Sequence, residues 1–184
     1  MEVEIITVKN ILLVEDDPQD VELTLNALAE HGLANRVAVV DNGADALDYL
    51  QHRGKFENRL AGNPIVILLD NKMPQLNGLE VLKAIKTDER LKTIPVVVLT
   101  SSGETVDLIE FYKHGANAYV VKPVDFSEFM KAVKRLGAFW ADVNEPPPMT
   151  RGEEPIGVQI DRGLVPEKEQ IKDGMPAPHP ALGG

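Results

Sequence analysis

Short apolar runs alternate with segments of helical periodicity from residue 10 to residue 142, and this alternation restricts the folds open to the chain. Three runs are apolar at every position: residues 11–14, 65–69 and 96–99. Continuous apolar strands of this kind are typical of a parallel sheet that is covered on both faces. Residues 36–40 and 118–121 are two weaker strand candidates. The pattern predicts an α/β fold with a doubly wound, five-stranded parallel sheet.

Helix signals follow each predicted strand. Asp17 can cap a helix that has Pro18 at its first position. Asp125 and Glu128 have the spacing of a capping box, with Asp in place of Ser or Thr. The five predicted helices span residues 18–31, 44–51, 78–88, 104–114 and 126–139.

The composition changes near residue 144. Eight of the 13 prolines and six of the 14 glycines lie beyond residue 143. Such a segment buries too little apolar surface to offset the entropy lost on ordering. We therefore expect one domain over residues 8–142 and an extended or disordered tail over residues 143–184. The tail is too short and too rich in proline for a helix-turn-helix output domain.

Composition and charge exclude several classes of protein. The chain has no cysteine, so it can form neither a disulfide nor a thiolate metal site. A net charge of −10 argues against binding to nucleic acid, which needs a basic surface. No apolar run approaches the roughly 20 residues of a membrane span, and the first residues do not resemble a signal peptide. A cytoplasmic protein that binds neither nucleic acid nor membrane is expected.

Polar residues follow the predicted strands where each strand ends. Glu15 and Asp16 follow the first strand, Asp70 the third, Thr100 the fourth and Lys122 the fifth. In a doubly wound sheet, ligands bind beyond the carboxyl ends of the strands. Clustered carboxylates repel one another unless a cation lies between them, and hard oxygen ligands suit Mg²⁺. A carboxylate beside that ion can accept a phosphoryl group, with the threonine and the lysine neutralising the phosphoryl oxygens.

Each of these residues also has an ordinary structural interpretation. Acidic residues at a strand end are often helix caps, and Asp17 before Pro18 fits that role. A single aspartate after a strand, such as Asp70, is often a turn residue. Thr100 alone could belong to a loop, and Lys122 alone could be a surface lysine. The combination of all four positions, in this order, favours the phosphoryl site.

At these residues the chain closely resembles the response-regulator receiver domains of two-component signalling. The resemblance covers about residues 8–142. The stretches that carry it are ILLVEDD at residues 11–17, LLDNKMP at residues 68–74 with Asn77 and Gly78, VLTSS at residues 98–102, and YVVKP at residues 119–123. It implies a flavodoxin-like sheet with strand order 2-1-3-4-5 and five helices.

The resemblance also implies a role for each site residue. Asp70 is similar to the phosphoacceptor, and Glu15, Asp16, Asp70 and the backbone carbonyl of Lys72 to the Mg²⁺ ligands. The phosphoryl-sensing groups implied are Thr100, the backbone of Ser101, and Lys122. Tyr119 stands at the position of the aromatic switch residue, and the peptide bond before Pro123 is expected to be cis.

The function implied is that of a phosphorylation switch rather than a conventional enzyme, with no fused output domain. The expected phosphodonor is a sensor histidine kinase. The long connection over residues 51–64 resembles stand-alone receivers that partner phytochrome-type kinases. The signal is expected to pass to a downstream protein or phosphotransfer partner, with a homodimer possible through the fourth helix, fifth strand and fifth helix. Six aromatic residues fall in that region, although half or more could simply pack in the core: Phe111, Tyr112, Phe126, Phe129, Phe139 and Trp140.

Three alternative functions are less consistent with the residues. A phosphatase or phosphotransferase of the haloacid-dehalogenase type also uses an aspartyl-phosphate, but it needs a second Asp where this chain has Lys72. A pseudo-receiver would keep the fold without phosphorylation, and the complete residue set argues against it. Nucleotide binding is disfavoured because no glycine-rich phosphate loop follows the first strand.

Overall fold

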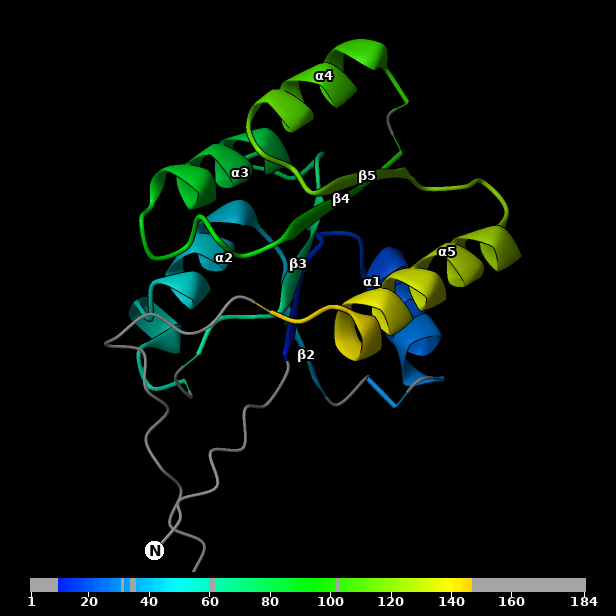
Figure 1. The fold of residues 1–184 in the computed structure, drawn as a ribbon, viewed down its shortest axis with the longest axis horizontal. Helices are drawn as coiled ribbons and strands as arrows, with labels where there is room; N and C mark the ends of the chain where they lie inside the picture. Colours follow the sequence, from blue (N-terminus) through cyan, green and yellow to red (C-terminus); the bar gives the residue numbers. More distant parts are fainter. Residues whose placement is uncertain (1–9, 31, 34–35, 60–61, 102, 147–184) are drawn as a thin grey trace, which may run out of the picture.

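The structure is a computed structural model, and it describes residues 10–30, 32–33, 36–59, 62–101 and 103–146 (Figure 1). Of the predicted tail, residues 147–184 lie outside the described residues. The expected domain boundary at residue 8 lies outside them as well.

Five parallel strands form one sheet in the order β2-β1-β3-β4-β5. The strands are β1 (Ile11–Val14), β2 (Val37–Val40), β3 (Val66–Asp70), β4 (Val96–Thr100) and β5 (Ala118–Val121). Every residue of β1, β3 and β4 is buried. The predicted sheet and its strand order are therefore confirmed, and the continuous apolar runs are the central strands.

Five α-helices connect and follow the strands (Figure 1). They are α1 (Pro18–Ala29), α2 (Gly43–Leu50), α3 (Gly78–Thr87), α4 (Thr105–Lys113) and α5 (Phe126–Ala138). The described residues also include a 3₁₀ turn, η2 (Gly54–Phe56), and a π-helical turn, η3 (Phe139–Val143), that continues α5. All five predicted helices are present, with ends within two residues of those expected. No helix in the described part of the chain is long and apolar enough to cross a membrane.

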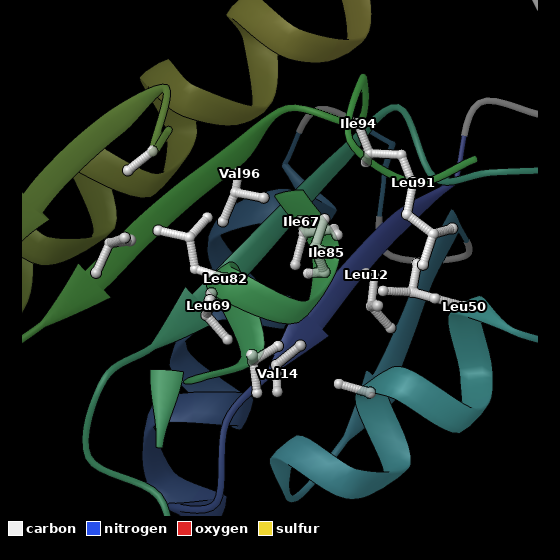
Figure 2. Close-up of a cluster of buried hydrophobic side chains, with 14 of the residues drawn as sticks. Leu12, Val14, Leu50, Ile67, Leu69, Leu82, Ile85, Leu91, Ile94 and Val96 are labelled. Carbon is white, nitrogen blue, oxygen red and sulfur yellow. The ribbon is translucent and has the colours of Figure 1, made fainter. Parts of the chain in front are cut away.

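Successive residues of each strand point to opposite faces of the sheet, so the core has two layers. Leu12 and Val14 pack with side chains of α2 and α3 on one face (Figure 2), and the same layer includes Phe111 of α4. Ile11 and Leu13 pack with side chains of α1 and α5 on the other face. Both layers hold the central strands rigidly, so the groups at their carboxyl ends have a fixed support.

Polar side chains cap the helices that begin near these strand ends. The Asp17 side chain accepts a hydrogen bond from the Gln19 N–H at the start of α1, as predicted. The capping box, however, is at α3, where Asn77 and Glu80 exchange hydrogen bonds with each other's backbone N–H. At α5 the Asp125 side chain accepts from the Glu128 N–H, but the Glu128 carboxylate pairs with Lys131.

The long connection before β3 is partly folded. Its 3₁₀ turn places Phe56 edge-on to Tyr49 of α2, with ring centroids 5.3 Å apart. The Arg59 guanidinium lies over the Tyr49 ring at 4.3 Å and donates to the Tyr49 carbonyl. Through these contacts the connection between α2 and β3 packs against α2, on the face of the sheet that α2 covers.

Candidate functional site

The sheet brings the predicted site residues to one edge. Glu15 directly follows β1, Asp70 and Thr100 are the last residues of β3 and β4, and Lys122 directly follows β5. The register aligns these ends, since Val14 pairs with Leu69 and Asp70 pairs with Leu99. The backbone N–H of Lys122 donates to the Thr100 carbonyl at 2.7 Å. Segments more than 100 residues apart in sequence therefore meet at one site.

The Lys122 ammonium lies among three carboxylates. Its Nζ donates to Glu15 Oε2 at 2.6 Å and to Asp20 Oδ2 at 2.7 Å. It also forms an ion pair with Asp70 Oδ1 at 3.0 Å. The side chains of Lys122, Glu15 and Asp70 are 11%, 3% and 7% exposed. Because little water reaches these charges, their interactions are stronger than those of a surface ion pair.

Glu15, Asp16 and Asp70 form an acidic cluster that could hold a metal ion. One carboxylate oxygen of each residue lies within 4.8 Å of the others. Glu15 and Asp70 are buried, whereas Asp16 is exposed. Among the described residues, Asp20 brings the carboxylates around the Lys122 ammonium to four, which gives these side chains a formal net charge of −3. Oxygen donors in this number, with one side open to solvent, suit a hard divalent cation that keeps part of its water shell.

The crowding shifts two pKa values in the same direction for different reasons. Burial alone would lower the pKa of Lys122, but hydrogen bonds to Asp20 and Glu15 and the charge of Asp70 raise it above its ordinary value. Burial raises the pKa of Glu15, and the Asp70 charge adds to this, although the Lys122 ammonium opposes it. A raised lysine pKa favours its charged form, whereas a raised glutamate pKa disfavours its charged form. Both shifts are expected when one ammonium is shared among three carboxylates. The ammonium has more than one negative partner, whereas each carboxylate has only part of one positive partner.

Backbone groups fix the Asp70 side chain. The Lys72 N–H donates to Asp70 Oδ2 at 2.6 Å, which leaves Oδ1 toward Lys122. The Gly78 N–H donates to the Asn71 carbonyl at 3.0 Å and closes the loop after β3. A Cβ on Gly78 would lie 2.3 Å from the Asp70 carbonyl oxygen, so only glycine fits at the start of α3. The structure thus places the Lys72 N–H at the site, and its carbonyl remains a predicted metal ligand.

Thr100 and Tyr119 lie on the same side of the sheet. Thr100 is fully buried and follows Val96 and Val98 at alternate positions of β4, both of which belong to the α2–α3–α4 layer. Tyr119 of β5 is half-buried against that layer, with its ring 5.6 Å from the ring of Phe111. Ser101 follows Thr100 and is exposed. Thr100 and Tyr119 therefore both face the α2–α3–α4 layer, and the role of Tyr119 as a switch residue stays a prediction.

The prediction of a cis peptide before Pro123 is wrong in this structure, because no described peptide bond is cis. The trans form of such a bond is favoured by about 0.5–1 kcal/mol. The Lys122 ammonium reaches its three carboxylates with the trans bond, so the ion network described above does not require the cis form.

Asp20 was not predicted from the sequence as a site residue. It lies in the first turn of α1, four residues after Asp16, and contacts Lys122 from 102 positions away in sequence. The sequence does show that Asp20 falls in the first turn of a predicted helix that begins beside Glu15 and Asp16. It does not show whether Asp20 lies on the side of that helix that faces the site.

Known proteins are similar to this chain in sequence and in fold. The relative Rcp1 of Synechocystis sp. is 37% identical over 134 residues, covering 73% of this chain and 90% of Rcp1. The structure of the phosphorylated cyanobacterial phytochrome response regulator RcpA matches with a TM-score of 0.72 and 37% identity, over 77% of this chain and all of RcpA. The bacteriophytochrome response regulator RtBRR is 56% identical, with a TM-score of 0.62 over 77% of this chain and 86% of RtBRR.

The family model of the response regulator receiver domain matches residues 11–134. That match begins at β1 and ends within α5, so it includes every strand end that contributes to the site. The chain belongs to the response regulator receiver domain family.

Proposed function

We propose that this chain is a two-component response regulator that accepts a phosphoryl group on Asp70 in a Mg²⁺-dependent reaction and changes conformation in response. One observation carries the proposal. The Asp70 carboxylate has an ammonium 3.0 Å away and two further carboxylates with oxygens within 4.8 Å. A nucleophile, a countercharge and a set of metal ligands therefore share one site.

The chemistry follows from the groups present. A carboxylate oxygen of Asp70 attacks phosphorus, and the bond from phosphorus to the donor's leaving group breaks, with that group keeping the electron pair. Charge on the transferred group is spread over three oxygens, so catalysis requires positioning and neutralisation. Lys122 supplies one positive charge, while the Thr100 hydroxyl and the Ser101 N–H supply hydrogen bonds.

The residues present fit a divalent cation. Glu15, Asp16 and Asp70 would hold it with their carboxylates, and the Lys72 carbonyl would complete the protein ligands. When bound, Mg²⁺ neutralises charge on a phosphoryl oxygen and on the carboxylates around it. The solved structures include a Mn²⁺-bound form of Rcp1, 36% identical with a TM-score of 0.71, which supports a divalent metal in this fold.

Incubation of the whole chain with acetyl phosphate tests the proposal. With Mg²⁺ present, intact-mass measurement should show the addition of one phosphoryl group, and excess EDTA should prevent it. A chain that binds Mg²⁺ but never gains the phosphoryl mass would be a pseudo-receiver, and the proposed function would be wrong.

Thr100→Ala is expected to keep phosphoryl uptake but weaken the switch. A hydrogen bond to a charged group contributes about 1.5–3 kcal/mol, whereas shifting a population from 1:99 to 99:1 takes about 5.5 kcal/mol. Thr100 therefore supplies part of the switch, with Lys122 and the cation supplying the rest. The phosphorylation-dependent gain in self-association should fall by about tenfold or more, measured by sedimentation velocity with and without acetyl phosphate. Identical self-association before and after phosphorylation of the wild-type chain would show that the switch does not act through a homodimer, and equal affinity for a downstream partner as well would contradict the switch itself.

The surface that carries the signal is proposed to be the face of α4, β5 and α5, through a homodimer or a downstream protein. Of the six aromatic residues predicted there, Phe111 and Phe129 are buried and Trp140 is half-buried, whereas Tyr112, Phe126 and Phe139 are exposed. Exposed apolar side chains continue along α4, the end of β5 and the connection from β5 to α5: Val106, Leu108, Ile109, Val121 and Val124. Apolar side chains gathered in this way are typical of an interaction surface.

A phytochrome-type histidine kinase is the proposed phosphodonor. The support is the 56% identity to the bacteriophytochrome response regulator RtBRR and the folded connection between α2 and β3. A phosphorylated bacteriophytochrome kinase should lose its label to this chain within minutes, well before it labels an unrelated receiver at equal concentration. Equal transfer rates to both receivers would remove the support for this partner.

A further inference from the structure

The Asp20 side chain belongs to the ion network of the site, although it is not among the clustered metal-ligand candidates. It lies in the first turn of α1, and its Oδ2 accepts a hydrogen bond from Lys122 Nζ at 2.7 Å. Its side chain is 31% exposed, against 3% for Glu15 and 7% for Asp70. Asp20 is therefore the partner of Lys122 with the most access to water.

The Lys122 ammonium is shared among three carboxylates. An ammonium offers three N–H donors, and two of them are committed to Glu15 and Asp20. Asp70 Oδ1 lies 3.0 Å from the same nitrogen. A phosphoryl group on Asp70 therefore competes with Glu15 and Asp20 for the donors of one ammonium.

Burial decides which partner Lys122 releases. Glu15 is almost fully buried, and leaving a buried carboxylate without a cation is strongly unfavourable. Asp20 can instead be hydrated when its partner leaves, so its release costs less. On the basis of the function proposed above, we propose that Asp20 is a positioning residue. It holds Lys122 in the unphosphorylated state and competes with the phosphoryl group on Asp70 for the ammonium.

Asp20 also adds negative charge beside the carboxylate that an anionic phosphodonor must approach. Removing its charge should therefore free Lys122 and reduce repulsion of the donor at the same time. Both effects act in one direction, toward faster phosphorylation. A residue with only a structural role would not produce this result.

Asp20→Asn in the full chain tests the proposal, with Glu22→Gln as the matched control. Glu22 is an exposed acid on the same helix, outside the ion pairs of the described residues, and its substitution removes the same unit of charge. Phosphorylation by acetyl phosphate with Mg²⁺ is followed by intact mass at several donor concentrations. We expect Asp20→Asn to react about fivefold faster than wild type, the equivalent of releasing one partly exposed ion pair, and Glu22→Gln to react at nearly the wild-type rate.

A second readout follows the contact directly. In the Mg²⁺-free chain, the side-chain ¹⁵N signal of Lys122 should shift in Asp20→Asn and stay unchanged in Glu22→Gln. An unshifted signal would show that Asp20 does not hold the ammonium. A rate for Asp20→Asn that equals the control, or falls below wild type, would show that Asp20 does not compete. Failure of the wild-type chain to gain a phosphoryl group would instead overturn the proposed function, while the ¹⁵N result would still report on the contact.

Discussion

Asp70→Asn should leave the chain folded and remove essentially all phosphoryl uptake from acetyl phosphate. An amide oxygen is too weak a nucleophile to attack phosphorus, because it carries no full negative charge. The asparagine can still accept the Lys72 N–H that Asp70 Oδ2 accepts at 2.6 Å, so the loop after β3 keeps its support. Intact mass after incubation with acetyl phosphate and Mg²⁺ measures the loss, and circular dichroism confirms that the variant is folded.

The control for this substitution is Asp17→Asn. It also replaces an aspartate at a strand end with asparagine, but Asp17 is exposed and its side chain caps α1. Asparagine caps a helix about as well as aspartate, so this variant should be phosphorylated like the wild type. Persistent labelling of Asp70→Asn at the wild-type rate would place the nucleophile elsewhere, with Asp16 as the first candidate to map.

The parts of the site that could be predicted from sequence are those attached to strands. Because the central strands are buried on both faces, their apolar runs have clear ends, and the parallel sheet aligns those ends at one edge. The apolar runs therefore assign Glu15, Asp70 and Thr100 to one place, and the weaker strand candidate over residues 118–121 adds Lys122. The structure confirms that the strand ends next to these residues meet at one edge.

The parts that could not be predicted depend on how side chains compete for partners. Asp20 is one of two acidic residues on α1, and only the packing of that helix shows that it reaches Lys122. Glu128 has the spacing of a capping box but pairs with Lys131 in the next turn, whereas Asn77 and Glu80 form a box that was not predicted. Each choice depends on small free-energy differences between alternative contacts, which sequence spacing does not reveal.

Lys122→Gln is expected to lower the free energy of unfolding by about 3 kcal/mol in the absence of divalent cations, because removing one partner of a buried ion pair leaves the others uncompensated. Here the carboxylates left behind are Glu15 and Asp70, both buried, and the partly exposed Asp20. The pKa of Lys122 is raised above its ordinary 10.5, so its stabilising effect is complete below pH 10.5 and is lost only as the pH rises beyond that value. Urea denaturation in EDTA at neutral pH therefore measures the full effect.

The same substitution at Lys131 provides the control. Lys131 is 56% exposed and pairs with Glu128 one helical turn away on α5, so Lys131→Gln should change the free energy of unfolding by no more than about 0.5 kcal/mol.

The response of each variant to Mg²⁺ should also distinguish the two substitutions. A cation held by Glu15, Asp16 and Asp70 replaces the charge that Lys122→Gln removes, and a ligand that binds only the folded state stabilises it. Mg²⁺ should thus restore more stability to Lys122→Gln than it adds to the wild type or to Lys131→Gln. Equal losses in the two lysine variants would mean that the three carboxylates are not held together by Lys122.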